Sequence, residues 1–266
     1  MNKVTQTLDQ ITGGQVSWHL QQWKALTSDP NVLTIVEGDH LEFTSLPPTK
    51  HNAYSSNFSA EEHKLISTEI ENLLAKNVIM VSSHEDIEYV SPIFLTPKSD
   101  GGHRMILNLS QLNDNIKYEH FKMDNIQTVL HLITPYCYMC KIDLKDAYYR
   151  IKMDDFYQKF LKFCWEHTLY QFVCYPNGLC SCPRRFTKLM KVPLCLLRIQ
   201  GCEICGYIDD FIILGFTYLA CLNLAKKVVA LFTNLGFLIH RVKSLSPSSF
   251  LLNTYSFWGS VLTPLT

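Results

Sequence analysis

The sequence predicts an α+β fold with a mostly antiparallel sheet, and three observations support this class. Segments with helical and with strand periodicity alternate along the 266 residues. Asp100-Gly101-Gly102 lies between two β-rich runs, which is typical of a hairpin joining antiparallel strands. Hydrophobic residues make up 47% and charged residues 18% of the chain, as in globular proteins with a substantial core. The length fits one large domain or two small ones.

Each predicted element has a local signal. Ser59 and Glu62 form a capping box that opens a helix with one apolar face. Pro183 marks the first turn of a helix that meets Pro193, and Gly236 ends another helix. The expected elements are, in chain order, a helix at 18–26, a strand at 41–43, a helix from 60, strands at 78–81, 93–96 and 105–109, a helix at 124–133, strands at 137–144, 160–163 and 170–174, a helix from 183, a strand–turn–strand around 206–214, a helix at 217–235, and strands at 238–240 and 256–262.

The charge balance and the N-terminal sequence narrow the function classes. The formal net charge is +0, which argues mildly against a nucleic-acid-binding protein, although a local basic groove would escape this count. The N-terminal segment MNKVTQTLDQ has no apolar signal-peptide core, and the longest apolar stretch, 211–222, is interrupted by Gly215 and Thr217. We therefore expect cytoplasmic or nuclear residence, no membrane partner and reduced thiols.

Ten cysteines include two C-x-x-C pairs, Cys137/Cys140 and Cys202/Cys205. Such pairs can hold zinc. Both pairs lead into predicted strands, where residues three apart point to opposite faces, so a pair cannot share a metal without a turn. We interpret these cysteines as small core residues rather than as zinc ligands.

Two acidic clusters carry the candidate chemistry. GYIDDFIIL, residues 206–214, places Asp209 and Asp210 at the turn between two apolar strands. A single pair of this kind is common in solvated turns. KIDLKDAYY, residues 141–149, adds Asp143 at the end of another apolar strand. If the two strand ends lie together, three carboxylates converge, and their mutual repulsion requires a compensating cation.

Oxygen ligands without cysteine or histidine favour Mg²⁺. Two Mg²⁺ ions about 4 Å apart stabilise the attacking and leaving oxygens of a phosphoryl transfer. We therefore predict a two-metal site in which Asp143, Asp209 and Asp210 are both metal ligands and catalytic residues, with Mn²⁺ as the alternative ion. Asp146, three residues after Asp143, is assigned a structural role.

Three motifs strengthen this hypothesis through a resemblance to a known family. KIDLKDAYY, YPNGLCSCPRRFTKLM and GYIDDFIIL, in this order and spacing, resemble the central motifs of reverse transcriptases. PKSDGGHRMILNLSQLN resembles their fingers hairpin, and LGFLIHRVKS and SFWGSVL take the places of a later palm motif and the primer grip. Within the family the sequence most resembles DIRS-like, tyrosine-recombinase retrotransposons, whose lead-in is similar to WKALTSDPNVLTIVEGDHLEF.

The resemblance implies a right-hand polymerase fold with fingers and a ferredoxin-like palm of antiparallel sheet and packed helices. Residues 1–50 would form a lead-in segment, and 51–135 the fingers, with a contribution from 165–185. Residues 136–266 would form the palm, which ends at the primer-grip region. Thumb and RNase H segments are absent from the 266 residues, and we expect them downstream in the full element.

The resemblance also implies residue roles. Asp143 and Asp209 would be the metal-binding catalytic carboxylates, and Asp210 would complete the acidic set. Tyr148 would be the bulky residue that excludes a ribose 2′-hydroxyl. The implied dNTP-binding residues are Lys98, Arg104, Tyr148, Asn177, Gly178 and Lys243, and the implied primer grip is Phe257, Trp258 and Gly259. The implied partners are an RNA or DNA template, a primer and dNTPs.

The implied activity is RNA-directed DNA polymerisation, in which dNTPs are added to a primer 3′-hydroxyl by two-metal-ion phosphoryl transfer. Asn177, Trp258 and the residues before Lys243 depart from the common family pattern. The alternative is therefore a truncated, catalytically inactive retrotransposon remnant that folds and binds nucleic acid or protein. A third interpretation, a non-polymerase palm such as that of a nucleotide cyclase, ranks last because it would need neither the hairpin at 92–109 nor the YPNG segment.

Overall fold

The computed structural model describes residues 13–53, 57–97, 102–134, 136–240, 244, 247–249, 255–257 and 260–262. Contacts divide the chain into two units, each assembled from segments that are distant in sequence. Unit 1 comprises Met1–Leu20, Leu33–Glu119 and Tyr148–Cys182, and unit 2 comprises Gln21–Val32, His120–Ala147 and Pro183–Thr266. Every pairing between named strands is antiparallel, which confirms the predicted α+β class.

Unit 1 contains a three-stranded sheet, a separate hairpin and short helices. The sheet order is β1-β6-β5, and β2 pairs with β3. Its elements are η1 (Gln15–His19), α4 (Ala60–Ala75), β1 (Ile79–Val81), β2 (Ile93–Pro97), β3 (His103–Leu107), α5 (Ser110–Asn113), η2 (Tyr148–Arg150), α7 (Asp155–Gln158), β5 (Lys162–Trp165) and β6 (Thr168–Phe172). Two more helices, α2 (Leu20–Leu26) and α3 (Pro30–Gly38), cross the boundaries between the two units.

The predicted start of α4 is confirmed. The Ser59 hydroxyl accepts a hydrogen bond from the Glu62 N–H at 3.2 Å, and the Glu62 carboxylate accepts one from the Ser59 N–H at 2.9 Å. These bonds satisfy two of the N–H groups that a helix start leaves without intrahelical partners. The predicted hairpin is also confirmed, with β2 and β3 paired from Ile93 opposite Leu107 to Pro97 opposite His103.

Unit 2 is built around a five-stranded sheet. Its order is β10-β4-β8-β7, and β9 also pairs with β4. Its elements are α6 (Ile126–Leu132), β4 (Tyr138–Lys145), α8 (Cys182–Ile199), β7 (Glu203–Tyr207), β8 (Asp210–Gly215), α9 (Tyr218–Asn234), β9 (Leu238–Ile239), β10 (Ser248–Ser249) and a backbone hairpin of β11 (Tyr255–Phe257) and β12 (Ser260–Leu262).

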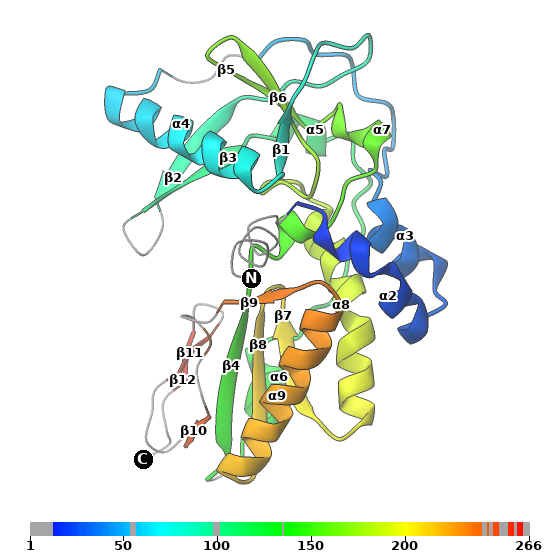
Figure 1. Ribbon diagram of the computed structural model, residues 1–266, viewed down its shortest axis with the longest axis vertical. Coiled ribbons are helices and arrows are strands. Elements are labelled where there is room, and N and C mark those ends of the chain that lie inside the picture. Colours follow the sequence, from blue (N-terminus) through cyan, green and yellow to red (C-terminus); the bar gives the residue numbers. More distant parts are fainter. Residues whose placement is uncertain are drawn as a thin grey trace, which may run out of the picture. The chain divides into compact units, whose positions relative to one another are not determined.

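The strands of unit 2 are apolar on both faces because helices cover both faces. Figure 1 shows α9 crossing one face of the sheet, with α6 behind it. Side chains alternate along a strand, so neighbouring residues of β8 enter different cores. Ile212 and Leu214 belong to the cluster that includes Val129 of α6. Phe211 packs edge-on against Phe232 of α9, with ring centroids 4.8 Å apart.

Three predicted elements differ from those observed. Helix α8 does not stop at Pro193 but continues to Ile199, because residues such as Leu194 and Leu197 are buried beyond the proline. The strand expected at 41–43 is a single bridge between Phe43 and Ile116. The segment 256–262 forms two short strands rather than one.

The cysteines of both C-x-x-C pairs are buried and form no disulfide within the described residues, as expected for core residues. Burial raises the pKa of both the Cys140 and the Cys205 thiol to about 11. These two thiols are therefore protonated near neutral pH and serve as apolar packing groups. Separately, none of the helices in the described residues combines the length and apolarity required to cross a bilayer.

We predict that Gly206→Ala destabilises the protein. Gly206 lies opposite Phe211, and an added β-carbon would lie 2.7 Å from a ring carbon of Phe211 and 3.1 Å from Leu194. Overpacking of this kind costs about 1–3 kcal/mol, so the melting temperature should fall in thermal unfolding. Gly38→Ala is the control, because its new β-carbon would make ordinary contacts with Asp154. Equal melting temperatures for the two variants would contradict the packing argument.

Candidate metal-binding active site

The pairing of β4 with β8 brings two of the predicted carboxylates together. Asp143 of β4 lies directly opposite Asp210 of β8. Residues directly opposite in an antiparallel pair project from the same face, and like charges in this arrangement repel each other. Asp143 is only 8% exposed, so this repulsion is poorly screened by water. The register therefore sets two of the predicted carboxylates on the same face of the sheet.

Asp209 lies in the turn next to this pair. Ile208 and Asp209 connect β7 to β8, and Asp209 is exposed. Ile208 has a φ of 55°, which a β-branched residue rarely adopts. A positive φ suits the twist of a two-residue hairpin, but glycine or asparagine normally provides it. Backbone strain of this kind costs about 1–3 kcal/mol and clusters at functional sites, so the turn is itself a functional signal.

Backbone hydrogen bonds fix the positions of these aspartates. The Leu144 N–H donates to the Asp209 carbonyl at 2.8 Å, which ties the turn to the end of β4. The Asp143 carbonyl accepts from the His240 N–H at 2.8 Å, and the Asp143 N–H donates to the Ser244 hydroxyl at 3.1 Å. The backbone of Asp143 is thus held by His240 and Ser244, and the backbone of Asp209 by Leu144.

Lys141 is a site residue that the sequence analysis missed. Its Nζ lies 3.0 Å from Asp210 Oδ1, and the side chains of Lys141 and Asp210 are 18% and 21% exposed. Lys141 precedes Asp143 by two positions, and side chains two apart share one face of a strand. The period-two rule, applied to KIDLKDAYY, could have found it. Asp146 lies in the turn after β4 with a φ of 53°, which aspartate tolerates better than most residues.

Four of the predicted dNTP-binding residues are among the described residues of unit 1. Arg104 is an exposed residue of β3. Tyr148 is partly buried at the start of η2, and its ring centroid lies 6.3 Å from that of Tyr175. The Asn177 amide donates to the Tyr149 hydroxyl at 3.0 Å.

Gly178 meets a specific steric demand. It has a φ of 105°, and a β-carbon at this position would lie 2.7 Å from the Leu107 carbonyl oxygen. Its own carbonyl accepts a hydrogen bond from the Asn113 amide at 2.9 Å. Only glycine fits this conformation and this close approach to β3. The Asn177–Gly178 turn is thus fixed against the end of the hairpin.

The other predicted residues cannot be placed. Lys98, Lys243, Trp258 and Gly259 lie outside the described residues, and Phe257 belongs to β11 as backbone only. The structure therefore brings together Asp143, Asp209 and Asp210 within unit 2. The roles of the remaining residues stay predictions.

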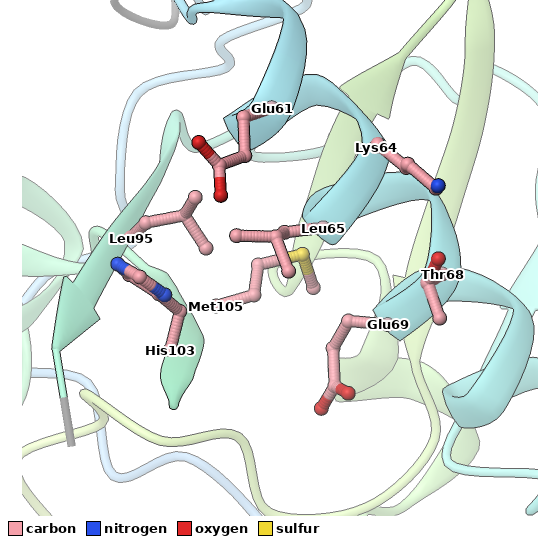
Figure 2. Close-up of a pocket in the computed structure, with 8 residues that line it drawn as sticks. All are labelled: Glu61, Lys64, Leu65, Thr68, Glu69, Leu95, His103 and Met105. Carbon is pink, nitrogen blue, oxygen red and sulfur yellow. The ribbon is translucent and has the colours of Figure 1, made fainter. Parts of the chain in front are cut away.

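A separate hollow of about 410 Å³ lies between α4 and the β2–β3 hairpin. Figure 2 shows Leu65, Leu95 and Met105 pointing toward one another at its centre, with Glu61 to one side. The lining residues include none of the predicted site residues. This hollow is therefore distinct from the acidic cluster of unit 2.

Comparison with known proteins identifies relatives of this chain. The family model described as reverse transcriptase (RNA-dependent DNA polymerase) matches residues 96–247. An enzymatic polyprotein of Cassava vein mosaic virus is 28% identical over 153 residues, which are 56% of this chain and 23% of the polyprotein. The Transposon Tf2-3 polyprotein of Schizosaccharomyces pombe is 23% identical over 152 residues, 57% of this chain and 11% of that protein.

Solved structures share the fold. A foamy viral protease-reverse transcriptase in complex with dsDNA superposes with a TM-score of 0.70 at 20% identity, covering 85% of this chain and 45% of that chain. The same type of protein in complex with an RNA/DNA hybrid gives 0.67 at 19% identity, with coverages of 91% and 32%. The fold is thus the fingers and palm fold of reverse transcriptases.

The chain spans less than half the length of each of these relatives. The matched residues 96–247 nevertheless include the hairpin arm with Arg104, the three carboxylates and the Asn177–Gly178 turn. The family model matches more than half of the residues of this chain, and the chain therefore belongs to the reverse transcriptase (RNA-dependent DNA polymerase) family.

Proposed function

We propose that this chain is the RNA-directed DNA polymerase domain of a retrotransposon of the DIRS-like type, and that it adds dNTPs to a primer 3′-hydroxyl. The observation that carries the proposal is the register that sets Asp143 opposite Asp210, with Asp209 in the adjoining turn. Family membership supports the reaction class. The DIRS-like assignment is based on the resemblance of the sequence within the family, with the lead-in segment as an additional similarity.

Asp143, Asp209 and Asp210 would hold the divalent ions. Their donor atoms are all carboxylate oxygens, which suit Mg²⁺, with Mn²⁺ as the alternative. When bound, the two ions supply charge that activates the 3′-hydroxyl and neutralises the leaving pyrophosphate. Lys141 offsets part of the negative charge of Asp210 and holds its carboxylate in place. Because Lys141 already pairs with Asp210, the main metal ligands in this proposal are Asp143 and Asp209.

The partners follow from the same proposal. Related structures contain dsDNA or an RNA/DNA hybrid, which supports a template and primer duplex as the ligand of this chain. In this proposal the fingers are residues 51–135 with a contribution from 165–185, most of which lie in unit 1, and the palm is 136–266, most of which lies in unit 2. Arg104, Tyr148, Asn177 and Gly178 would contact the dNTP, as would Lys98 and Lys243. Phe257, Trp258 and Gly259 would contact the primer.

The decisive experiment is primer extension on poly(rA)–oligo(dT) with Mg²⁺ and dTTP. Asp209→Asn removes a ligand charge from an exposed turn, so the fold should persist. Extension should fall at least about 100-fold, because several kcal/mol of charge stabilisation are lost. Glu203→Gln is the matched control, since Glu203 lies on the same hairpin at the far end of β7 and should leave extension unchanged.

Unchanged extension by Asp209→Asn would refute the two-metal assignment. Absence of extension in the parent chain would instead favour the inactive remnant. Repeating the assay on the longer element would then show whether a downstream thumb restores activity.

We predict that Tyr148→Ala admits ribonucleotides, because loss of the ring opens space for a 2′-hydroxyl. The preference for dTTP over UTP should fall at least about tenfold in single-nucleotide incorporation assays. Tyr148→Phe, which keeps the ring, should retain the preference. An unchanged preference in Tyr148→Ala would remove this residue from the sugar-selection role.

We predict that Lys141→Met makes stability depend more strongly on Mg²⁺. Loss of the cation leaves Asp143 and Asp210 repelling each other in a partly buried site, which costs about 1–2 kcal/mol. Added Mg²⁺ binds the folded state and should raise the melting temperature of the variant more than that of the parent. Lys226→Met, on the exposed face of α9, should respond as the parent does. Equal Mg²⁺ responses in all three proteins would contradict this role of Lys141.

A further inference from the structure

Two histidines and a glutamate converge in unit 1. Glu88 Oε1 lies 2.8 Å from His51 Nδ1 and 2.5 Å from His84 Nδ1. The three potential ligand atoms all lie within 4.8 Å of one another. Imidazole nitrogen and carboxylate oxygen are the donor types that Zn²⁺ combines in proteins. These residues take no part in the proposed polymerase reaction.

The glutamate is held rigidly by buried groups. Glu88 is fully buried, and its second oxygen, Oε2, accepts hydrogen bonds from Lys162 Nζ at 2.8 Å and from the Glu85 N–H at 3.0 Å. Lys162 is itself fully buried and also donates to the Ser83 carbonyl at 2.7 Å. One carboxylate oxygen is thereby fixed by protein partners, while the other faces the two imidazoles.

This carboxylate remains ionised over the physiological pH range. Burial alone would raise the pKa of Glu88, but hydrogen bonds from His84, Lys162 and His51 lower it to about 2. Carboxylates that bind metal ions are usually hydrogen-bonded to the surrounding protein, as Glu88 is through Oε2.

Backbone hydrogen bonds position His51, the third potential metal ligand. The Lys50 N–H donates to the Glu88 carbonyl at 2.9 Å, and the Val90 N–H donates to the Lys50 carbonyl at 2.8 Å. This bridge fixes His51 beside the loop that carries His84 and Glu88. The side chains of His51 and His84 are 50% and 58% exposed, so an ion can enter from solvent and water can complete its coordination.

We propose that His51, His84 and Glu88 form a site for one divalent transition-metal ion, with Zn²⁺ as the best match to the donors. Tetrahedral Zn²⁺ with bonds of about 2.0–2.1 Å keeps its ligand atoms about 3.3 Å apart. The two distances from Glu88 Oε1 to the ring nitrogens would therefore lengthen by less than about 1 Å, and the two ring nitrogens, which lie within 4.8 Å of each other, would adjust to the same spacing. On binding, a neutral ring carries its proton on Nε2 instead of Nδ1, and an imidazolium releases one proton to solvent.

The bound ion would link distant parts of unit 1. His51 precedes α4, His84 and Glu88 follow β1, and Lys162 connects Glu88 to β5. The role assigned to the site is structural, since the ion would add a side-chain cross-link between the His51 segment and the loop of His84 and Glu88, which also meet through backbone hydrogen bonds. This inference is independent of the proposed polymerase activity.

The test uses the full chain with its thiols kept reduced, and Co²⁺ and Zn²⁺ as probes. We expect one equivalent of Co²⁺ to give the visible bands of a nitrogen and oxygen site without a thiolate charge-transfer band. Zn²⁺ should displace it and raise the melting temperature. His51→Ala and His84→Ala should each weaken binding at least about tenfold.

His63→Ala is the matched control, because His63 also lies beside a glutamate in unit 1, 3.4 Å from Glu166, and both of these side chains are exposed. Its affinity should equal that of the parent. Absence of binding by the parent, a thiolate band, or undiminished affinity in His51→Ala and His84→Ala would each overturn the proposal. The spectrum of the parent tests it even where a variant fails to fold.

Discussion

The antiparallel ladder between β4 and β8 is the constraint on which the rest of unit 2 depends. It places Asp143 opposite Asp210 and, in the same register, sends Ile212 toward α6 and Phe211 toward α9. Because the side-chain period of a strand is two, a slip of one residue would exchange its two faces. The acidic pair and both apolar cores would then be lost together. Packing of the cores therefore maintains the geometry of the site.

The same site combines two features that are unfavourable for the stability of the fold. Asp143 and Asp210 are like charges on one face, and Ile208 is held at a positive φ. Neither feature is expected in a segment selected for stability alone, and both are typical of functional positions. Lys141 offsets part of the repulsion from within the same strand. In unit 1 the opposite balance holds, because Glu88 is buried with the cation Lys162 and hydrogen-bonded on both oxygens.

The resemblance of the ordered motifs led to the correct family, and comparison with known proteins confirms it. The metal ions and the activity are proposals that rest on the carboxylate geometry, and the subfamily is a proposal that rests on sequence resemblance. Local signals were most reliable where they depend on neighbouring residues, as in the capping box of Ser59 and Glu62. They failed at Pro193, where burial of the following turn holds α8 together despite the lost hydrogen bond.

The sequence by itself determined the fold class and the order of the motifs, and it predicted the three carboxylates, because periodicity, caps and turns are encoded by residues close together in the chain. Only the tertiary structure decided that Asp143 faces Asp210, that Lys141 pairs with Asp210, and that His51 meets His84 and Glu88. These contacts depend on strand register and on bridges between distant segments. No local pattern specifies such pairings, since their energy arises only when the segments pack.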